Sequence, residues 1–517
     1  MYWNIGKIIG KRANLTPKKT AIIFEDRPIT YKMLNDDTNR FAHYLQKAGI
    51  KKGDRIALNL LNCPQFITIF FAAAKLGIII VPLNFRIVAE ELKYQLNDSG
   101  ARMLLFHDIV VKNIEPVKNA VKIEKDKFIC LKSNLPDQPK CHKWAIGYDK
   151  VIADMPVYEP DPAGHIDCDD PLAIIYTSGV TGNPKGAVLS HIQTYFKNFQ
   201  ITMYTDMRSS DIFLSQLPLF RSGGLFISAM PVLCRGATMI LRQNHTPLEF
   251  AEDIGKYRAT IIFALTNMWR FIIHTKALDD VDISSVRCVI GGGEKTPPKL
   301  VQELANKGLY MQSGFGQTEN SFMTLLPKAD IQRKEGSVGL PGFFTEVWIE
   351  NEKKEKAMPG EVGEIVASGP TVVSGYWNMP DKSDETIING VLHTGDIGYT
   401  DEEGYFYIVG RADDLYIRGG ENVYPAEVEK ILANHPKIED IAIIGVPDMK
   451  WGETGVAVIV AKEGVNISKR EIREYLKGKV AGYKIPTHTE FVESLPKTAS
   501  GKIKKAKLKE WFLTGWR

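Results

Sequence analysis

In the first hundred residues, short apolar runs alternate with segments whose apolar residues have helical spacing. Residues 20–24 and 55–60 are short, β-branched apolar runs, which is typical of buried strands. Residues 31–48 and 89–97 carry apolar side chains at the spacing of an amphipathic helix. The most apolar run, 66–81, is broken by a lysine and a glycine and is too short to span a bilayer, so it predicts a core helix followed by a buried strand. Such alternation favours an α/β sheet layer.

A second α/β unit is predicted further along the chain, where strand patterns again alternate with helical ones. We expect helices over 187–203 and 298–307, and a peripheral, less regular region over 113–163. Several of the expected strands run into glycine-rich segments. Because ligands bind beyond the carboxyl ends of strands in open α/β sheets, these segments are expected to face one site. The expected strands are 172–175, 212–215, 238–241, 259–263 and 286–290.

The last third of the chain changes character twice. Short strands and turns over 336–410 predict a small β-rich subdomain. The polar segment 411–414 joins it to 423–517, where the order helix, strand, strand, helix, strand predicts a separate small domain.

Composition narrows the class of protein. A chain of 517 residues is too long for one ordinary domain. Its net charge of +4 argues against a nucleic-acid-binding protein, which needs a concentrated basic surface. The six cysteines have the spacing of neither a disulfide framework nor a zinc site, and residues 1–10 lack a signal-peptide pattern. These features predict a cytoplasmic protein without a transmembrane segment, a disulfide framework or a zinc site.

The loop 176–186, Y-T-S-G-V-T-G-N-P-K-G, has the composition of a phosphate-binding loop. Its glycines let backbone N–H groups point at an anion, its hydroxyls add donors, and Lys185 adds charge. It departs from the standard P-loop, because Pro184 replaces a glycine and Gly186 replaces the metal-binding hydroxyl. The alternative is a surface loop without a ligand.

Four later segments add to this loop: G-F-G-Q-T-E at 314–319, H-T-G-D at 393–396, G-R-A-D-D at 410–414 and P-K-T-A-S-G-K at 496–502. In this order they resemble the motifs of the adenylate-forming acyl-CoA synthetase family. That family also contains luciferases and the adenylation domains of peptide synthetases. The resemblance covers essentially the whole chain.

The resemblance implies a fold and its domains. The implied fold class is α/β, with a large N-terminal domain of two α/β sheet subdomains plus a small β-barrel-like subdomain, and a smaller, mobile α+β C-terminal domain. The implied AMP-binding domain is 1–411, with its β-rich subdomain at about 336–410. The mobile domain that carries the catalytic lysine is 412–517.

The resemblance also assigns roles to the motif residues. Glu319 and Thr181 would help to hold Mg²⁺. Phe315 stands where relatives have a tyrosine that stacks on adenine. A carboxylate at Asp396 suits a ribose diol, because it only accepts hydrogen bonds. The implied ATP- and AMP-binding residues are Thr177, Ser178, Gly179, Thr181, Gly182, Lys185, Gly292, Gly293, Gly314, Phe315, Gly316, Gln317, Thr318, Asp396 and Arg411.

Other motif residues are implied to act in catalysis and in coenzyme A (CoA) binding. Lys502, which ends the 496–502 segment, and Glu319 would be the catalytic residues. Asp413 would be the hinge of the mobile domain. The tunnel for CoA would be lined by Arg418, Gly419 and Gly420.

The activity that the resemblance implies is an AMP-forming carboxylate–CoA ligase. A carboxylic acid, fatty or aryl, would attack the α-phosphate of ATP to give an acyl-adenylate and pyrophosphate, and CoA would then displace AMP. The alternatives are an acyl-AMP ligase that delivers to a carrier protein, a luciferase-like oxygenase, and a nucleotide-binding protein without catalysis. Whether the protein forms a homodimer is left open, and no nucleic-acid partner is expected.

Arg221, Gly223 and Gly224 are candidates for the acyl pocket. Acyl- and aryl-CoA relatives often have a histidine where this chain has Arg221. A permanent cation there would favour a substrate with a second polar or acidic group. Alternatively, Arg221 would form a salt bridge with a neighbouring acid and face away.

Overall fold

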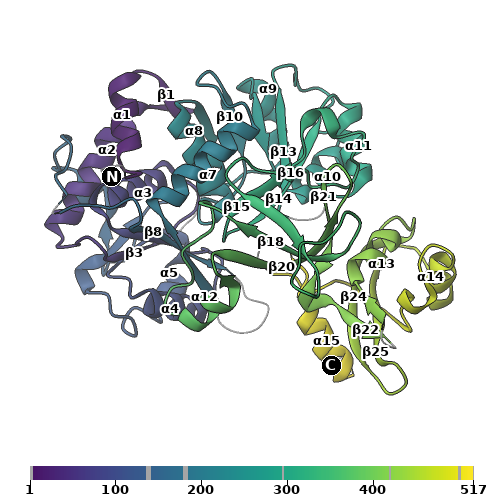
Figure 1. Cartoon of the computed structure of the whole chain (residues 1–517). Helices are drawn as coiled ribbons and strands as arrows, with labels where there is room; N and C mark the ends of the chain where they lie inside the picture. The colour runs from purple at the N-terminus through teal and green to yellow at the C-terminus, as the bar shows by residue number, and fades with distance from the viewer. Residues whose placement is uncertain are drawn as a thin grey trace. The chain divides into compact units, whose positions relative to one another are not determined.

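Figure 1 shows the computed structural model of the chain. The structure describes residues 4–135, 141–162, 164–177, 184–293, 296–418, 421–498 and 502–515. The chain divides into two compact units, Met1–Val347 with Ala367–Leu392 and Trp348–Val366 with His393–Arg517. The predicted boundary between residues 411 and 412 follows a different division and stays a prediction.

The first unit contains a seven-stranded sheet in the order β7-β6-β5-β3-β4-β8-β9. Its neighbouring strands are parallel except β8 and β9. Almost every residue of α3 (Pro64–Leu76) is buried, which explains a helix that is apolar all round. With β4 (Ile79–Pro82), α3 confirms the predicted core helix and buried strand. The remaining elements are α2 (Tyr31–Lys47), β3 (Arg55–Asn59), α4 (Ala89–Ser99), β5 (Met103–His107), α5 (Val111–Ile114), β6 (Phe128–Leu131), β7 (Ile146–Gly147), α6 (Tyr148–Ile152), β8 (Pro171–Thr177) and β9 (Lys185–Ser190).

A nine-stranded sheet of the same unit has the order β16-β15-β14-β13-β12-β10-β11-β1-β2. Its inner strands are parallel, whereas β2, β15 and β16 at the two edges are antiparallel to their neighbours. The two α/β sheet layers that the sequence predicts are therefore confirmed. The elements are α1 (Lys7–Leu15), β1 (Thr20–Phe24), β2 (Arg27–Thr30), α7 (His191–Tyr204), β10 (Ile212–Ser215), the π-helix η3 (Gly223–Ala229), α8 (Met230–Arg235), β11 (Thr238–Leu241), α9 (Pro247–Lys256), β12 (Ile261–Phe263), α10 (Thr266–His274), β13 (Cys288–Gly292), α11 (Pro298–Asn306), β14 (Met311–Gln317), β15 (Ser321–Leu325), β16 (Leu340–Pro341) and α12 (Pro380–Thr386).

The predicted helix over 187–203 is wrong at its start. Its first residues belong to β9, which pairs with β8 in an antiparallel register. Helix α7 begins only at His191, where Ser190 and Gln193 form a reciprocal capping box. The apolar run 187–189 is buried within the sheet, so its hydrophobicity reflects a strand and not a helix face. The 176–186 loop therefore connects two strands of a hairpin instead of leading into a helix.

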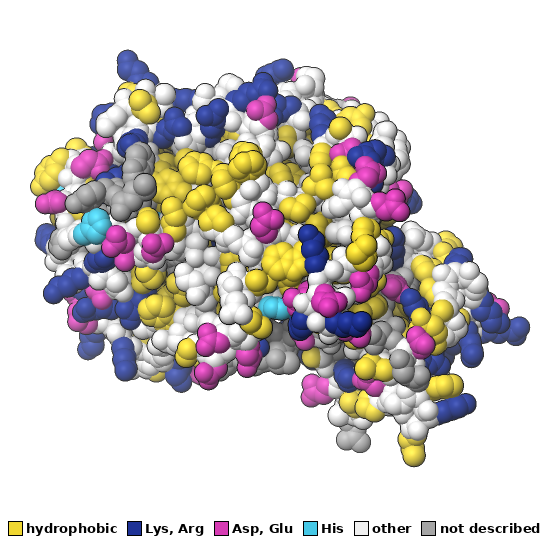
Figure 2. All heavy atoms as spheres, in the orientation of Figure 1, with side chains coloured by type: hydrophobic (Ala, Val, Ile, Leu, Met, Phe, Trp, Pro, Cys, Tyr) yellow, Lys and Arg dark blue, Asp and Glu magenta, His cyan; other side chains and the backbone are white. Residues whose placement is uncertain are grey.

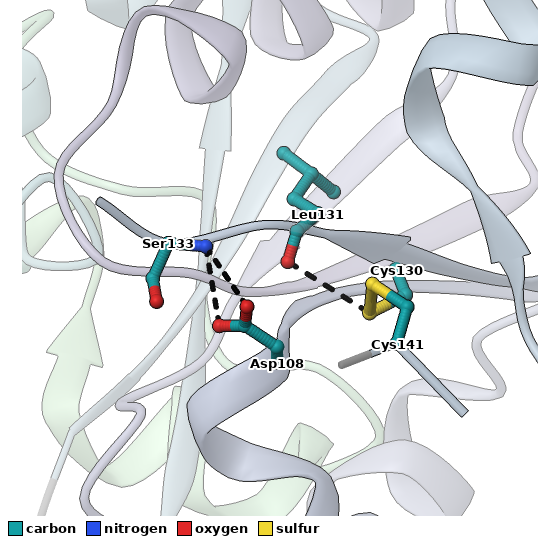
Figure 3. The surroundings of a disulfide bond; sticks show 5 residues. All are labelled: Asp108, Cys130, Leu131, Ser133 and Cys141. Atoms are coloured by element: carbon teal, nitrogen blue, oxygen red, sulfur yellow. Dashed lines mark hydrogen bonds between the residues drawn. A yellow bond between two sulfur atoms is a disulfide. The ribbon is translucent and has the colours of Figure 1, made fainter. Parts of the chain in front are cut away.

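The region 113–163 is more regular than predicted. It contributes β6 and β7 to the seven-stranded sheet, and Cys130 forms a disulfide bond with Cys141 (Figure 3). Beside it, the Asp108 carboxylate accepts hydrogen bonds from the Ser133 N–H at 3.1 and 3.2 Å. The expectation that the cysteines form no disulfide framework is thus corrected for this one pair, because cysteine spacing does not reveal which strands meet. The free cysteines are Cys63, Cys168, Cys234 and Cys288.

The predicted β-rich subdomain corresponds to a five-stranded sheet in the order β17-β18-β20-β19, with β21 beside β20. Most of it belongs to the second unit. Its strands are β17 (Glu346–Glu350), β18 (Gly363–Ser368), β19 (Ile387–Ile388), β20 (Val391–Thr400) and β21 (Phe406–Arg411).

The second unit also contains a sheet in the order β23-β22-β25-β24, with β26 beside β25. Alternate residues of β24 enter two buried clusters, one with α13 and α14 and the other with α15, so helices cover both faces (Figure 1). The predicted order of elements is confirmed, and a final helix is added. The elements are β22 (Tyr416–Arg418), β23 (Glu421–Val423), α13 (Pro425–Leu432), β24 (Ile438–Asp448), β25 (Gly452–Ala461), α14 (Lys469–Leu476), β26 (His488–Phe491) and α15 (Lys505–Leu513).

Charged side chains of both signs are interspersed on the face drawn in Figure 2, with hydrophobic side chains between them. This agrees with a chain that has 65 Lys and Arg residues and 61 Asp and Glu residues. Within the described ranges, no helix has both the length and the apolar character that are needed to cross a bilayer.

Candidate active site

The β8–β9 hairpin holds both ends of the predicted phosphate loop. Thr177 and Lys185 lie opposite each other, and the Thr177 hydroxyl donates a hydrogen bond to the Lys185 carbonyl at 3.4 Å. The pairing determines where the loop leaves the sheet and where it rejoins it. The predicted loop residues that lie outside the described ranges are Ser178, Gly179, Thr181 and Gly182.

Tyr376 connects this hairpin to the predicted metal-binding carboxylate. Its phenol donates a hydrogen bond to Glu319 Oε1 at 2.8 Å, and its ring centroid lies 5.5 Å from Lys185 Nζ. The segment that carries Tyr376 is fastened to β9, because the Trp377 N–H donates to the Gly186 carbonyl at 2.7 Å. A cation, an aromatic ring and a carboxylate therefore lie next to one another in space. We call these three residues the Lys185–Tyr376–Glu319 row.

Glu319 lies in the connection between β14 and β15. The residue is 6% exposed, and its carbonyl accepts a hydrogen bond from the Val373 N–H at 2.7 Å. A carboxylate that is buried to this extent requires donors or a cation, and Tyr376 supplies one donor. Its oxygens are hard ligands of the kind that Mg²⁺ prefers, so the donor type fits the predicted metal.

Glycines in β13 and β14 are required by strand packing. A Cβ at Gly316 would lie 1.7 Å from the Ser321 carbonyl oxygen, and one at Gly314 would lie 2.4 Å from the Phe322 ring. A Cβ at Gly292 would lie 2.9 Å from the Gly314 carbonyl oxygen. Close packing therefore accounts for these three glycines, whether or not a nucleotide lies against them. The other predicted ATP-binding residues of this region are Gly293, Phe315, Gln317 and Thr318, of which Phe315 is 9% exposed.

In the second unit, β20 and β21 place Asp396 opposite Arg411. The two side chains form an ion pair at 3.1 Å, and the Arg411 guanidinium also donates to the Thr394 carbonyl at 3.0 Å. A carboxylate and a guanidinium side by side offer the acceptor and the donor that a ribose and a phosphate require.

Glu364 supports the same turn. Its carboxylate accepts a hydrogen bond from the Gly395 N–H and meets the His393 ring, each at 2.9 Å. Glu364, His393 and Glu350 have the spacing of a metal site within the described residues. Both Glu364 oxygens are used by the turn, and Glu350 pairs with Lys354 at 3.0 Å, so this cluster has a structural explanation.

The predicted hinge and CoA-tunnel residues lie directly after β21. Asp413 is exposed in the short turn Ala412–Asp414. The Arg418 guanidinium donates to the carbonyls of Tyr483 and Ile485 at 2.8 Å each, which ties β22 to the segment before β26. Gly419 and Gly420 lie outside the described residues.

Lys502 differs from the lysines around it. Lys505 and Lys497 form ion pairs at 2.8 and 2.6 Å, whereas Lys502 is exposed and its ammonium pairs with no described residue. Its backbone is held by a 2.7 Å hydrogen bond from the Thr498 N–H to the Lys502 carbonyl. A lysine with a fixed backbone and an uncommitted ammonium can act on a ligand.

The predicted acyl-pocket residues lie at the start of the π-helix η3, a helix type that is frequent at functional sites. Gly224 is required there, because a Cβ would lie 2.1 Å from the Pro218 carbonyl oxygen, and Gly223 is half-buried. Arg221 is exposed, and its guanidinium lies 5.5 Å from the Phe220 ring centroid. It forms no ion pair with a described acid, so the salt-bridge alternative finds no support among these residues.

Sequence reasoning missed two residues of this region, Tyr376 and Lys197. Tyr376 follows a glycine and precedes a tryptophan, a pattern that carries no chemical signal. Lys197 lies in α7 and is completely buried. Burial lowers its pKa, and the charge of Glu319 opposes this shift. The sequence signal that could have identified it is helical spacing. Polar Gln193 and Gln200 lie one turn before and after Lys197, so the three residues share one face of the helix.

Comparison with known proteins identifies the family. A family model described as AMP-binding enzyme matches residues 9–377, which is more than half of the chain. The chain belongs to the AMP-binding enzyme family. A second model, the AMP-binding enzyme C-terminal domain, matches residues 427–502. The resemblance to adenylate-forming acyl-CoA synthetases is therefore confirmed.

Similar proteins match this AMP-binding enzyme along nearly its whole length. Feruloyl-CoA synthase of Amycolatopsis sp is 35% identical over 97% of this chain and 98% of its own. Long-chain-fatty-acid–CoA ligase FadD13 of Mycobacterium tuberculosis is 34% identical over 98% of each chain. Both of these proteins are named for the formation of CoA thioesters.

Solved structures of CoA ligases share the fold. The anthranilate CoA ligase AuaEII, in complex with anthranoyl-AMP, has a TM-score of 0.90 and 26% identity and covers 99% of this chain and 98% of that one. The o-succinylbenzoate CoA synthetase MenE of Bacillus subtilis, in complex with ATP and a magnesium ion, has a TM-score of 0.85 and 30% identity and covers 97% and 99%. The predicted fold class is confirmed by this agreement.

Proposed function

We propose that this AMP-binding enzyme is an ATP-dependent, AMP-forming carboxylate–CoA ligase. It activates a carboxylic acid, fatty or aryl, to an acyl-adenylate with release of pyrophosphate, and then transfers the acyl group to CoA with release of AMP. The proposal rests chiefly on the Lys185–Tyr376–Glu319 row, which lies at the phosphate loop of a chain that matches CoA ligases from end to end.

The first half-reaction brings two anions together, since the acid's carboxylate must attack a phosphate. In our proposal Lys185 and the loop from Thr177 bind the phosphate chain, and Lys502 places its ammonium against the charge that grows in the transition state. Glu319 and Thr181 would hold Mg²⁺, which, when bound, neutralises charge on the phosphate oxygens. Tyr376 keeps the Glu319 carboxylate oriented by its hydrogen bond.

The nucleoside is bound by residues of several strands. Asp396 accepts hydrogen bonds from the ribose hydroxyls, and Arg411 beside it binds a ribose or phosphate oxygen. Phe315 stacks on adenine next to the backbone of Gly314 and Gly316.

The second half-reaction needs a different group at the same place. We assign the change to rotation of residues 412–517 about Asp413, which removes Lys502 and brings Arg418, Gly419 and Gly420 to the CoA thiol's path. Asp413 is exposed in a short turn, where a change of backbone angles disturbs little packing.

The test is AMP release with Mg-ATP, CoA and a panel of ferulate, anthranilate and long-chain fatty acids. We expect AMP, pyrophosphate and an acyl-CoA in equal amounts with at least one acid. Pyrophosphate release without CoA consumption would instead indicate an acyl-AMP ligase, and uptake of O₂ a luciferase-like oxygenase. ATP binding without any release of pyrophosphate would indicate a protein without catalysis.

The homodimer and the cytoplasmic location remain predictions from the sequence. Sedimentation of the purified protein would decide the oligomeric state.

A further inference from the structure

Lys197 lies on the face of α7 that packs against β15. Gln193, one turn before it, donates a hydrogen bond to the Ser374 hydroxyl at 3.0 Å. Gln200, one turn after it, donates to the Phe322 carbonyl at 2.5 Å. Residues that are three or four positions apart share one face of a helix, so Lys197 points between these two contacts. Figure 1 shows α7 beside β15 in the first unit.

The ammonium of Lys197 has no hydrogen-bond partner in the part of the chain that the structure describes. The residue is 0% exposed, and Nζ makes no hydrogen bond to any described residue. An ammonium carries three donors, and burial without an acceptor is costly, so buried charges are normally paired. The two glutamines that flank it on this face of α7 are both hydrogen-bonded, whereas Lys197 is not.

The surroundings of Lys197 belong to the proposed adenylation site. Burial lowers the pKa of Lys197 to about 7, and the negative charge of Glu319 opposes this shift by favouring the ammonium form. Glu319 itself accepts the Tyr376 hydrogen bond within the Lys185–Tyr376–Glu319 row. Lys197 and Glu319 form no ion pair, so the amine is not used as the counter-ion of this carboxylate.

Two further polar groups next to Glu319 lack partners. Asn320 Nδ2 and Ser321 Oγ are buried and make no hydrogen bond to a described residue. Ser321 is the first residue of β15, the strand against which α7 packs, and it has φ +71°, a conformation that is unfavourable for a residue other than glycine. Strain and unmet donors at one place are common where a ligand completes the structure.

We propose that Lys197 binds an anionic oxygen of a reactant beside Glu319, either the carboxylate of the acid or the phosphate chain of ATP. This inference rests on the proposed function. It makes Lys197 a binding residue of the first half-reaction and gives a role to a buried lysine that has no hydrogen-bond partner among the described residues. It is distinct from Lys185 on the hairpin and from Lys502 near the C-terminus.

The test compares Lys197→Met with Lys75→Met. Methionine is close to lysine in length and is tolerated in cores, so Lys197→Met removes the charge with little change of volume. Lys75 is also buried, at 6% exposed, and its ammonium has three partners, Asn35, Asn39 and Glu159. For each variant, kcat and KM are measured for Mg-ATP and for the acid that the panel identifies, together with the midpoint of thermal unfolding.

We expect Lys197→Met to raise the KM of one reactant at least about tenfold, the size of a lost charge-assisted hydrogen bond, without a lower unfolding midpoint. A higher KM for the acid assigns the carboxylate, and a higher KM for ATP assigns the phosphate. Lys197→Arg should recover part of the loss, because it keeps the charge. Lys75→Met should lower the midpoint and leave both KM values unchanged.

Kinetic constants of Lys197→Met that stay within about twofold of the wild type would overturn the inference, and so would a lowered midpoint with unchanged KM values, which indicates a structural charge. If Lys197→Met does not fold, Lys197→Gln gives the same comparison with a polar side chain. A wild-type protein that releases no AMP with any acid overturns the proposed function and this inference together. An active wild type with unaffected variants overturns the inference alone.

Discussion

Lys75 and Lys197 are both buried in the first unit, but their surroundings are opposite. Lys75, in the last turn of α3, donates to Asn35 at 2.8 Å, to Asn39 at 2.6 Å and to Glu159 at 2.5 Å. Lys197, in the middle of α7, donates to no described residue. The first ammonium is part of a completed hydrogen-bond network, and the second remains available to a ligand.

The same contrast recurs at the C-terminal end of the chain. Lys505 pairs with Glu429 and with Asp414, while Lys502, three positions earlier, pairs with no described residue. Lys75 and Lys505 have ion-pair partners that stabilise the fold, whereas Lys197 and Lys502 have none among the described residues, and our proposals assign these two to ligands. Sequence composition cannot make this distinction, because all four residues are the same amino acid.

The largest effect is expected at Lys502. Lys502→Ala should lower pyrophosphate release by about 10²-fold or more, because it removes a charge donor placed for the transition state. It should largely spare transfer of the acyl group to CoA from a supplied acyl-adenylate. Lys505→Ala is the matched control, with reduced stability and unchanged adenylation. Equal loss of both half-reactions in Lys502→Ala would contradict the two-conformation proposal.

At Lys75 the expected effect is on stability. Lys75→Met should lower the free energy of unfolding by about 2 kcal/mol, because Asn35 and Asn39 are buried and lose their shared donor. Denaturant unfolding of the wild type and the variant measures this difference. If the free energy of unfolding is unchanged, the hydrogen bonds of Lys75 do not stabilise the fold, and the contrast with Lys197 fails.

A smaller kinetic effect is expected at Tyr376. Tyr376→Phe keeps the ring beside Lys185 but removes the hydrogen bond to Glu319, so adenylation should fall about tenfold, as for the loss of one hydrogen bond to a charged group. The control is Tyr204→Phe, since the Tyr204 hydroxyl donates to the carbonyls of Met323 and Leu340, at 3.1 and 3.4 Å, and not to a residue of the Lys185–Tyr376–Glu319 row. Equal rates in the two variants would remove Tyr376 from the site.

The smallest effect concerns a buried base that stays neutral. His107 Nδ1 accepts a hydrogen bond from the Leu61 N–H at 3.0 Å, and burial lowers the pKa of His107 from 6.5 to about 4, against the opposing charge of Asp108. Between these values the unfolded chain binds more protons than the folded one. The free energy of unfolding should therefore fall as the pH drops from about 6.5 towards 4.

His107→Asn measures the contribution of this histidine. An asparagine oxygen can take the place of Nδ1. Between pH 7 and pH 5.5, the free energy of unfolding of the variant should therefore fall by about 1 kcal/mol less than that of the wild type. The control is His274→Asn, at an exposed position, which should leave the pH dependence unchanged. An unaltered slope in His107→Asn would mean that the ring is protonated at little cost.

Local pattern was sufficient for most strands and for the family. Continuous β-branched apolar runs correctly predicted β1, β10 and β11, because parallel strands that are buried on both faces are apolar along their length. The local pattern failed at β9, because the apolar residues 187–189 also fit the buried face of a helix. Only pairing with β8 makes it a strand, and that pairing involves residues on the far side of a loop.

By itself, the sequence determined the order of motifs, and with it the family and the residues that motif spacing can name, such as Glu319, Asp396 and Lys502. Tertiary structure alone decided three further points. The predicted phosphate loop joins two paired strands, Tyr376 donates a hydrogen bond to Glu319, and Lys197 is buried with no hydrogen-bond partner among the described residues. Each of these points depends on contacts between residues far apart in the chain. Such contacts produce no periodic pattern or fixed spacing in the sequence.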